Sequence, residues 1–109
     1  MITYDDFAKL HIALGKVLAV EVIEGADKLL KCTVDFGEEA PRQIVSGIRP
    51  YLDDPQSLVG RTFPYLINLE YRTIRGVESQ GMILAASTGD GGFALLEPQP
   101  VLPPGTKIK

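Results

Sequence analysis

Apolar and polar residues alternate along two stretches of this chain, and a period of two residues predicts strands that are buried on one side. The two stretches are Leu30–Phe36 and Thr62–Leu69. A longer apolar stretch, His11–Ile23, predicts a first strand, in which Gly15 indicates a bulge or a sharp bend. Arg42–Ile48 follows Leu30–Phe36 after a short turn, so these two segments are expected to form a hairpin. The predicted core face of the second alternating stretch consists of Phe63, Tyr65, Ile67 and Leu69.

Two short helices are predicted from residues that cap helix ends. Near the N-terminus, Thr3 and Asp6 have the spacing of a capping box, and the strand that follows leaves room for about two helical turns. Later in the chain, Asp54 suits an N-cap, Pro55 suits the first helical position and Gly60 suits the helix end. The second helix therefore lies between the third and fourth predicted strands.

The last third of the chain predicts further short strands. Met82–Ala86 and Phe93–Leu96 flank a glycine-rich turn and are expected to form a hairpin, and the proline-rich tail is expected to add C-terminal extension strands. This order of elements predicts an all-β fold, a five-stranded Greek-key barrel of the oligonucleotide/oligosaccharide-binding (OB) type. A short β-sandwich is the alternative. The length of 109 residues suits one domain, spanning residues 1–109.

The distribution of charge narrows the classes of partner. The net charge of −3 argues against strong non-specific binding of nucleic acid. Residues 42–76, however, carry five arginines against three acidic residues, whereas the segments on either side are net negative. A weak or shape-dependent nucleic-acid contact is therefore compatible with the sequence. The chain start lacks the features of a signal peptide and no apolar run reaches membrane-spanning length, so we expect a cytoplasmic protein without a membrane partner.

The sequence offers no recognisable catalytic or metal site. Cys32 and His11 are the only cysteine and histidine, too few for a zinc site. Cys32 alternates with apolar residues and is expected in the core, and His11 stands at a strand start, where a structural role is expected. No spacing indicates a nucleophile with its base. We therefore expect a binding function with no catalytic residue, metal or cofactor.

The stretch Asn68–Met82 is the most informative part of the sequence for function. It is rich in polar residues and glycine, lies between apolar segments and is expected to form an exposed loop. Arg72 and Arg75 carry planar charged groups that suit phosphate. Two amides and a hydroxyl in the same stretch suit base or ribose edges. The alternative is a solvated surface turn without a partner.

Four segments together resemble one family: Gly25–Lys31, Arg42–Ile48, Asn68–Met82 and Pro103–Lys107. This family is the tRNA-binding domain found at the C-terminus of methionyl-tRNA synthetase, sometimes as a separate beta chain, and in free-standing tRNA-binding proteins. The resemblance covers nearly the whole chain, and Ser-Gln-Gly-Met at 79–82 with the upstream arginines is its most specific part.

The resemblance implies an OB-type barrel that binds the outside of the L-shaped tRNA with little sequence preference, as part of methionyl-tRNA synthetase or accessory to it. The residues that match family positions, and are expected to contact tRNA, are Lys28, Lys31, Arg42, Ser46, Asn68, Arg72, Arg75, Ser79, Gln80 and Met82. The family also implies a homodimer formed by the N-terminal helix and the C-terminal strands. The apolar residues expected at that interface are Ile2, Phe7, Leu10, Val101, Leu102 and Ile108.

One departure from the family pattern leaves two further functions open. The family loop commonly reads Asn-Leu-Lys-Pro-Arg-Lys, whereas residues 68–73 read Asn-Leu-Glu-Tyr-Arg-Thr, which makes this loop more negative by three charges. Weaker or altered tRNA affinity is the expectation. The alternatives are a secretion-type chaperone of the same fold that binds unfolded peptides, and a purely structural dimerisation domain.

Overall fold

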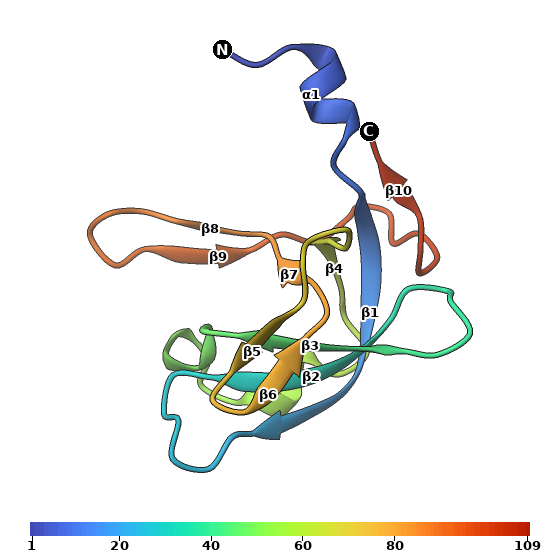
Figure 1. Ribbon diagram of the computed structural model, residues 1–109. Coiled ribbons are helices and arrows are strands. Elements are labelled where there is room, and N and C mark those ends of the chain that lie inside the picture. The colour runs from blue at the N-terminus through green and yellow to red at the C-terminus, as the bar shows by residue number, and fades with distance from the viewer.

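The protein is a nearly closed β-barrel with one short α-helix, as a computed structural model of residues 1–109 shows (Figure 1). Helix α1 (Tyr4–Ala8) begins at the predicted capping box: the Asp6 amide donates to Thr3 Oγ1 at 3.2 Å and the Thr3 amide donates to Asp6 Oδ2 at 3.1 Å. The helix has five residues, fewer than the two turns predicted, and none of them is buried. It therefore stands on the barrel rather than inside it.

Strand β1 (Ile12–Val22) is the centre of the sheet and pairs with three other strands. Its first half pairs with β4 (Thr62–Leu66), its second half pairs with β2 (Leu30–Asp35), and its first two residues also pair with β10 (Lys107–Ile108). The register with β2 shifts between Val17 and Ala19. The bulge of β1 thus lies at Leu18, two residues beyond Lys16, which pairs with both β4 and β2.

Gly15 has a role that differs from the prediction of a bulge. It pairs regularly with Phe63 across the β1–β4 ladder. A side chain at this position would place its Cβ 2.5 Å from Cε1 of Phe36 and 2.6 Å from Cγ1 of Val34. The glycine is therefore required because the Phe36 ring lies against the β1 backbone. Of the two features predicted at Gly15, a bulge or a sharp bend, the bulge is wrong, because the register shift lies between Val17 and Ala19.

The core is built from strands β1 to β4. Strand β2 alternates buried and half-buried residues as predicted, and it pairs with β3 (Arg42–Ser46) in the predicted hairpin. Two 3₁₀-helices, η1 (Arg49–Tyr51) and η2 (Pro55–Leu58), connect β3 to β4, and the Asp54 side chain caps η2 as predicted. The buried core cluster consists of Ala13, Val17, Val20, Leu30, Cys32, Val34, Phe36, Ile44, Ile48, Leu58, Phe63 and Tyr65.

Strand β4 is shorter than predicted. It ends at Leu66, and Leu69, assigned to the core face from the alternation, is 37% exposed. The Ile67 amide still donates to the His11 carbonyl at 2.8 Å, after which the chain turns away from the sheet. The apolar alternation thus continues past the last paired residue.

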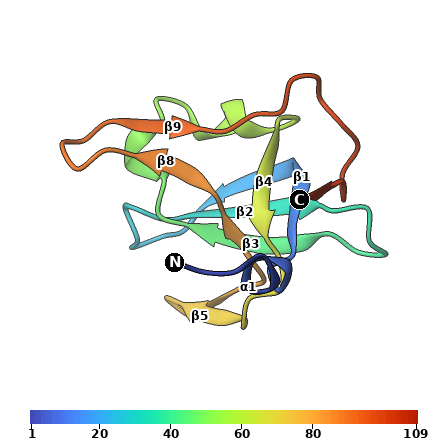
Figure 2. The same cartoon turned by 90° about the horizontal axis from the view of Figure 1, so that it is seen from above.

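The segment predicted as one exposed loop contains a separate hairpin. Strands β5 (Arg72–Ile74) and β6 (Val77–Ser79) pair only with each other, and β7 (Met82–Ile83) then returns to β4. The predicted strand Met82–Ala86 is split, because β8 (Ala85–Ser87) leaves the barrel and pairs with β9 (Phe93–Leu95). Figures 1 and 2 show β8–β9 as an arm that extends away from the barrel.

The barrel closes between β3 and the start of β7, where no strand ladder runs. The strand order is β3-β2-β1-β4-β7, and the seam between the two edges is held by hydrogen bonds around Gln80 and Ser79. The Gln80 amide donates to the Gln43 carbonyl at 2.8 Å. The predicted five-stranded barrel is confirmed.

Candidate nucleic-acid interface

The β5–β6 hairpin presents two arginines on a tight turn. Its two turn residues are Arg75 and Gly76, with φ of 54° and 78°. Two consecutive residues with positive φ form the type of two-residue turn that matches the twist of a hairpin. Arg75 therefore stands at the exposed tip, and Arg72 stands at the start of β5.

The tip of this hairpin lies beside the turn between β1 and β2. Figure 1 shows both at the end of the barrel opposite α1 and β10. Together they enclose a cleft of about 680 Å³, here called the basic cleft, and Arg75 Nη2 donates to the Gly25 carbonyl across it at 3.3 Å. The residues that line it are Gly25, Ala26, Asp27, Lys28, Leu29, Arg72, Thr73, Ile74 and Arg75.

A second concavity, here called the apolar groove, lies between β3, the β5–β6 hairpin and the β8–β9 arm. It has a volume of about 360 Å³. Tyr51 and Phe93 both line it, and their rings stack with centroids 4.3 Å apart and planes 8° from parallel. Arg72 lines both concavities and so separates the basic cleft from the apolar groove.

The structure brings three of the predicted tRNA contacts together in the basic cleft. Lys28, Arg72 and Arg75 are exposed and line it, although Lys28 is more than forty residues away in the chain. Met82 is also exposed but lines the apolar groove. Asp27 is the only acidic residue that lines the basic cleft, so its local charge is positive.

Ser79 and Gln80, predicted from the sequence as RNA contacts, hold the barrel seam. Ser79 is buried, accepts a hydrogen bond from the Val45 amide at 2.9 Å and donates to the Gly81 carbonyl at 2.9 Å. Gln80 Oε1 accepts from the Gln43 amide at 2.9 Å. These two side chains thereby replace the backbone partners that the β3 edge lacks.

Asn68, also predicted as an RNA contact, ties the N-terminal segment to the barrel. Its Oδ1 accepts from the His11 amide at 2.8 Å and its Nδ2 donates to the Lys9 carbonyl at 2.7 Å. Both ends of the amide group are thus used within the fold, at the junction between α1 and β1.

The register of β2 with β3 separates three of the residues expected to contact tRNA, Lys31, Arg42 and Ser46. Lys31 pairs with Val45, whereas Ser46 pairs with Leu30 and Arg42 pairs with Val34. Paired residues share a face and neighbours along a strand do not. Ser46 and Arg42 therefore lie on the face of the buried Leu30 and Val34, and Lys31, which pairs with Glu21 at 3.0 Å, lies on the other. These three residues therefore do not share one face of the sheet.

The apolar residues predicted for a dimer interface lie at the end of the barrel opposite the basic cleft. Ile2, Leu10, Val101 and Leu102 are exposed, while Phe7 and Ile108 are half-buried and line one small crevice between α1 and β10. Phe7, Leu10 and Ile108 thus meet at this end of the molecule, here called the apolar end.

Other candidate chemistry is absent or buried. No group of three or more histidine, cysteine, aspartate or glutamate residues is placed to hold a metal ion, and no helix is long and apolar enough to cross a membrane. Cys32 lies in the core as predicted, and burial raises the pKa of its thiol to about 11. It is therefore protonated at neutral pH, unlike a nucleophilic cysteine.

Gly25, Thr73 and Ile74 line the candidate site although they were not predicted to do so from the sequence. Gly25 carries a positive φ of 77° in the β1–β2 turn and offers its carbonyl to Arg75. The turn signal in the sequence could have indicated Gly25. Thr73 and Ile74 were not predictable, because the strands of the β5–β6 hairpin have only three residues each and leave no clear pattern in the sequence.

Comparisons with known proteins identify similar chains. The family described as "Putative tRNA binding domain" matches residues 12–107. Methionine–tRNA ligase of Deinococcus radiodurans is 47% identical over 109 residues, which are 100% of this chain and 16% of that ligase. The chain thus spans about a sixth of the length of this curated relative.

Two solved structures share the fold over the entire chain. The MetRS related protein from Pyrococcus horikoshii is 37% identical with a TM-score of 0.93, covering 100% of this chain and 98% of that one. The chaperone CsaA from Bacillus anthracis is 28% identical with a TM-score of 0.88, covering 100% and 99%. The same barrel therefore occurs in a MetRS related protein and in a chaperone.

Proposed function

Because this chain belongs to the tRNA-binding domain family, we propose that its basic cleft binds the phosphate backbone of tRNA. The observation that carries the proposal is the convergence of Lys28, Arg72 and Arg75, from two separate loops, on one exposed cleft. In OB-type barrels the loops after the first and fourth strands are the ones that contact nucleic acid. The β1–β2 turn and the β5–β6 hairpin occupy these two places in the chain.

The side chains of the basic cleft favour recognition of the shape of tRNA over recognition of its base sequence. Lysine and arginine that contact phosphate fix the position of a nucleic acid without reading its bases. The side chains suited to reading base edges, Asn68 and Gln80, are engaged within the fold. Little sequence preference among tRNAs follows. Affinity is moderate because Asp27 lines the same cleft and Glu70 lies near Arg72.

The test is a titration with several purified tRNAs at a series of salt concentrations. Each phosphate contact contributes a slope of roughly −0.7 to −0.9 in log affinity against log salt. Arg72→Ala and Arg75→Ala are each expected to weaken binding to all tRNAs alike and to flatten the slope by about one unit. Glu70→Lys is expected to strengthen binding.

The control is Lys16→Ala, which removes an exposed cation of β1 outside the basic cleft. If the two arginine variants bind tRNA as tightly as the parent at low salt, the proposal fails. An equal loss of tRNA affinity in Lys16→Ala and in the arginine variants would also contradict a specific role of the basic cleft.

The proposed setting is methionyl-tRNA synthetase, in which this domain raises tRNA affinity without contributing to the chemical step. The similarity to a methionine–tRNA ligase along the whole chain supports this assignment. We expect that adding the domain, in cis or in trans, lowers the tRNA KM of the synthetase and leaves kcat unchanged. A change in kcat alone would argue against it.

We further propose that the protein is a homodimer joined at its apolar end. Phe7, Leu10 and Ile108 meet there, and the exposed residues Ile2, Val101 and Leu102 would be covered by a partner that contacts α1 and the C-terminal segment. Sedimentation at micromolar concentration is expected to give a dimer, and Leu102→Glu is expected to give a monomer. Leu18→Glu is the matched control, because Leu18 is equally exposed on the bulge of β1. A parent protein that sediments as a monomer refutes the proposal.

A second candidate function is the binding of unfolded peptides in the apolar groove. The specific observation is the groove itself, in which aromatic rings and aliphatic side chains such as Ile74 and Met82 lie together beside the β8–β9 arm. The structural similarity to a chaperone is consistent with it. Titration of a denatured peptide against the parent and against Ala86→Gln separates the two functions, because Ala86 is exposed in the apolar groove and does not line the basic cleft.

A further inference from the structure

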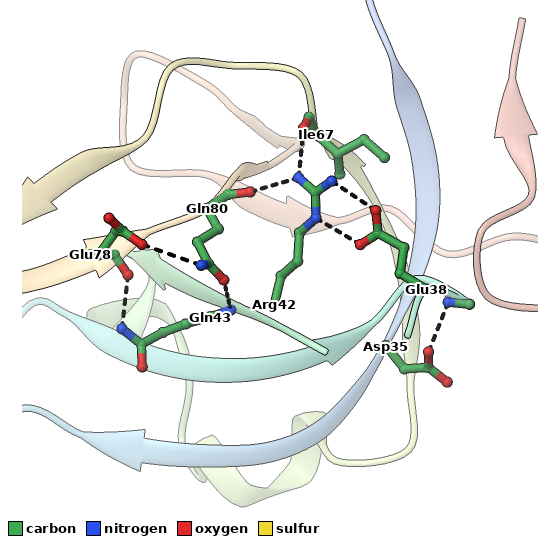
Figure 3. Close-up of polar contacts among 8 residues, drawn as sticks. Asp35, Glu38, Arg42, Gln43, Ile67, Glu78 and Gln80 are labelled. Atoms are coloured by element: carbon green, nitrogen blue, oxygen red, sulfur yellow. Dashed lines mark hydrogen bonds and ion pairs between the residues drawn. The ribbon is translucent and has the colours of Figure 1, made fainter. Parts of the chain in front are cut away.

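All three nitrogens of the Arg42 guanidinium donate hydrogen bonds within the protein (Figure 3). Nε and Nη2 donate to the two carboxylate oxygens of Glu38 at 2.8 and 2.9 Å. Nη1 donates to the carbonyl of Ile67 at 2.6 Å and to that of Gln80 at 3.0 Å. The side chain is 17% exposed and its charge is matched by that of Glu38. The hydrogen bonds from Arg42 lower the pKa of Glu38.

The two carbonyls that Arg42 holds lie at either side of the β5–β6 hairpin. Ile67 is the residue after β4, Gln80 is the residue after β6, and the whole hairpin lies between them. Strands β5 and β6 pair with no strand of the main sheet. The base of the hairpin is therefore attached to the barrel by Arg42 and by the seam bonds of Ser79 and Gln80.

The surroundings of Arg42 reinforce this attachment. Gln43, its neighbour on β3, donates from Nε2 to the Glu78 carbonyl at 2.8 Å, and Gln80 Nε2 donates to the Glu78 carboxylate at 3.2 Å (Figure 3). On its other side Arg42 lies 5.7 Å from the centroid of the Phe36 ring, a cation–π distance. The guanidinium is thus held in one position by the Glu38 carboxylate, by the carbonyls of Ile67 and Gln80 and by the Phe36 ring.

We propose that Arg42 and Glu38 are a brace that holds the β5–β6 hairpin in its RNA-binding position, and that Arg42 is a positioning residue rather than a phosphate ligand. The proposal rests on the proposed function, because the hairpin carries Arg72 and Arg75. Holding a loop in its bound conformation raises affinity by lowering the entropy that binding must remove. Glu38, an acidic residue, thereby favours the binding of a polyanion.

This brace and a simple charge effect predict opposite results for Glu38. Removing a carboxylate near a polyanion site should strengthen binding if charge alone matters. If the brace matters, Glu38→Gln should weaken binding, since glutamine cannot accept two charge-assisted bonds from the guanidinium. The next residue, Glu39, offers a matched control because it is also exposed and forms no ion pair.

The experiment is a tRNA titration of the full chain, with Glu38→Gln and Glu39→Gln, over a series of salt concentrations. We expect Glu38→Gln to bind about threefold to tenfold more weakly than the parent with an unchanged salt slope. Glu39→Gln should bind as tightly as the parent or more tightly. The proposal is overturned if Glu38→Gln binds as tightly as Glu39→Gln, or if its salt slope falls by about one unit as for a lost phosphate contact.

A measurement without RNA keeps the brace separate from the proposed function. Amide hydrogen exchange of residues 72–79 is expected to speed up several-fold in Glu38→Gln and in Arg42→Lys, which keeps the charge but loses the fork. Amides of the β1–β2 ladder should be unaffected. Unchanged exchange in residues 72–79 refutes the brace whatever tRNA does. If the parent binds no tRNA while exchange behaves as expected, the proposed function fails and the brace stands.

Discussion

Replacing Ser79 with alanine is expected to weaken the barrel seam rather than to remove an RNA contact. The hydroxyl accepts from the Val45 amide and donates to the Gly81 carbonyl, both at 2.9 Å. Ser79 and Val45 are 5% and 6% exposed, so water has little access to the groups that the substitution leaves behind. The main consequence is a buried N–H on the β3 edge without an acceptor.

The size of the effect follows from this unsatisfied donor. A buried donor that loses its partner costs about 1–3 kcal/mol in the free energy of unfolding. With a urea m-value of about 1.5 kcal/mol/M for a domain of this size, the unfolding midpoint should fall by roughly 0.7–2 M. The m-value itself should stay the same, since the folded state keeps its extent of burial.

The assay is equilibrium unfolding in urea followed by circular dichroism, with Ser87→Ala as the control. Ser87 is exposed on β8 and its loss should change the free energy of unfolding by less than about 0.5 kcal/mol. If Ser79→Ala lowers the free energy of unfolding by no more than Ser87→Ala does, the hydroxyl of Ser79 does not stabilise the barrel seam. A flattened salt slope of tRNA binding in the folded variant would instead return Ser79 to the role of a direct contact.

Three further predictions concern the core and its glycines. Gly15→Ala should cost about 1–3 kcal/mol in urea unfolding, and less in a Phe36→Leu background where the ring is gone; an equal cost in both backgrounds would contradict the proposed clash. The Cys32 thiol, with its pKa raised to about 11, should react with a disulfide reagent at pH 8 only after unfolding. Because the folded pKa is the higher one, the free energy of unfolding should also fall between about pH 9 and pH 11, and Cys32→Ala should lack this component. Gly105→Ala places a Cβ against the Phe36 carbonyl oxygen at a φ of +88°. The Leu14 amide donates to the carbonyl of the next residue, Thr106, so its hydrogen exchange should accelerate. Unchanged protection of this amide would show that the tail adapts to the substitution.

The strands that pack one face on the core were predictable from the sequence. Leu30–Asp35 forms the expected strand because every second residue is buried, and the caps at Thr3 and Asp54 were predictable from short-range spacing. The bulge of β1 was misplaced because glycine indicates either backbone freedom or close approach, and only the tertiary structure shows that Phe36 approaches Gly15.

The location of the site was predictable from the sequence, but which residues line the cleft and which form structural hydrogen bonds was not. Arg72 and Arg75 were identified as charged residues in a polar stretch, and they do line an exposed cleft. The β5–β6 hairpin was missed because its strands have only three residues each and its turn is Arg-Gly rather than one of the commonest pairs. The structural bonds of Asn68 and Arg42 span 59 and 38 residues, and no local pattern indicates such partners.

Because α1 lies beside β10, the strands could follow one another in a different order along the chain and still occupy the same places in the barrel. Tyr4 and Phe7 share a crevice with Ile108 and Lys109, so the first and last elements of the chain are neighbours (Figure 1). A short linker could join them, and new ends could be opened at the exposed tip of the β8–β9 arm, near Gly89. Such a circular permutant would begin with β9 and end with β8. The two loops of the basic cleft would stay uncut. The barrel and its cleft therefore depend on which strands lie side by side, and not on the order in which these strands follow one another in the chain.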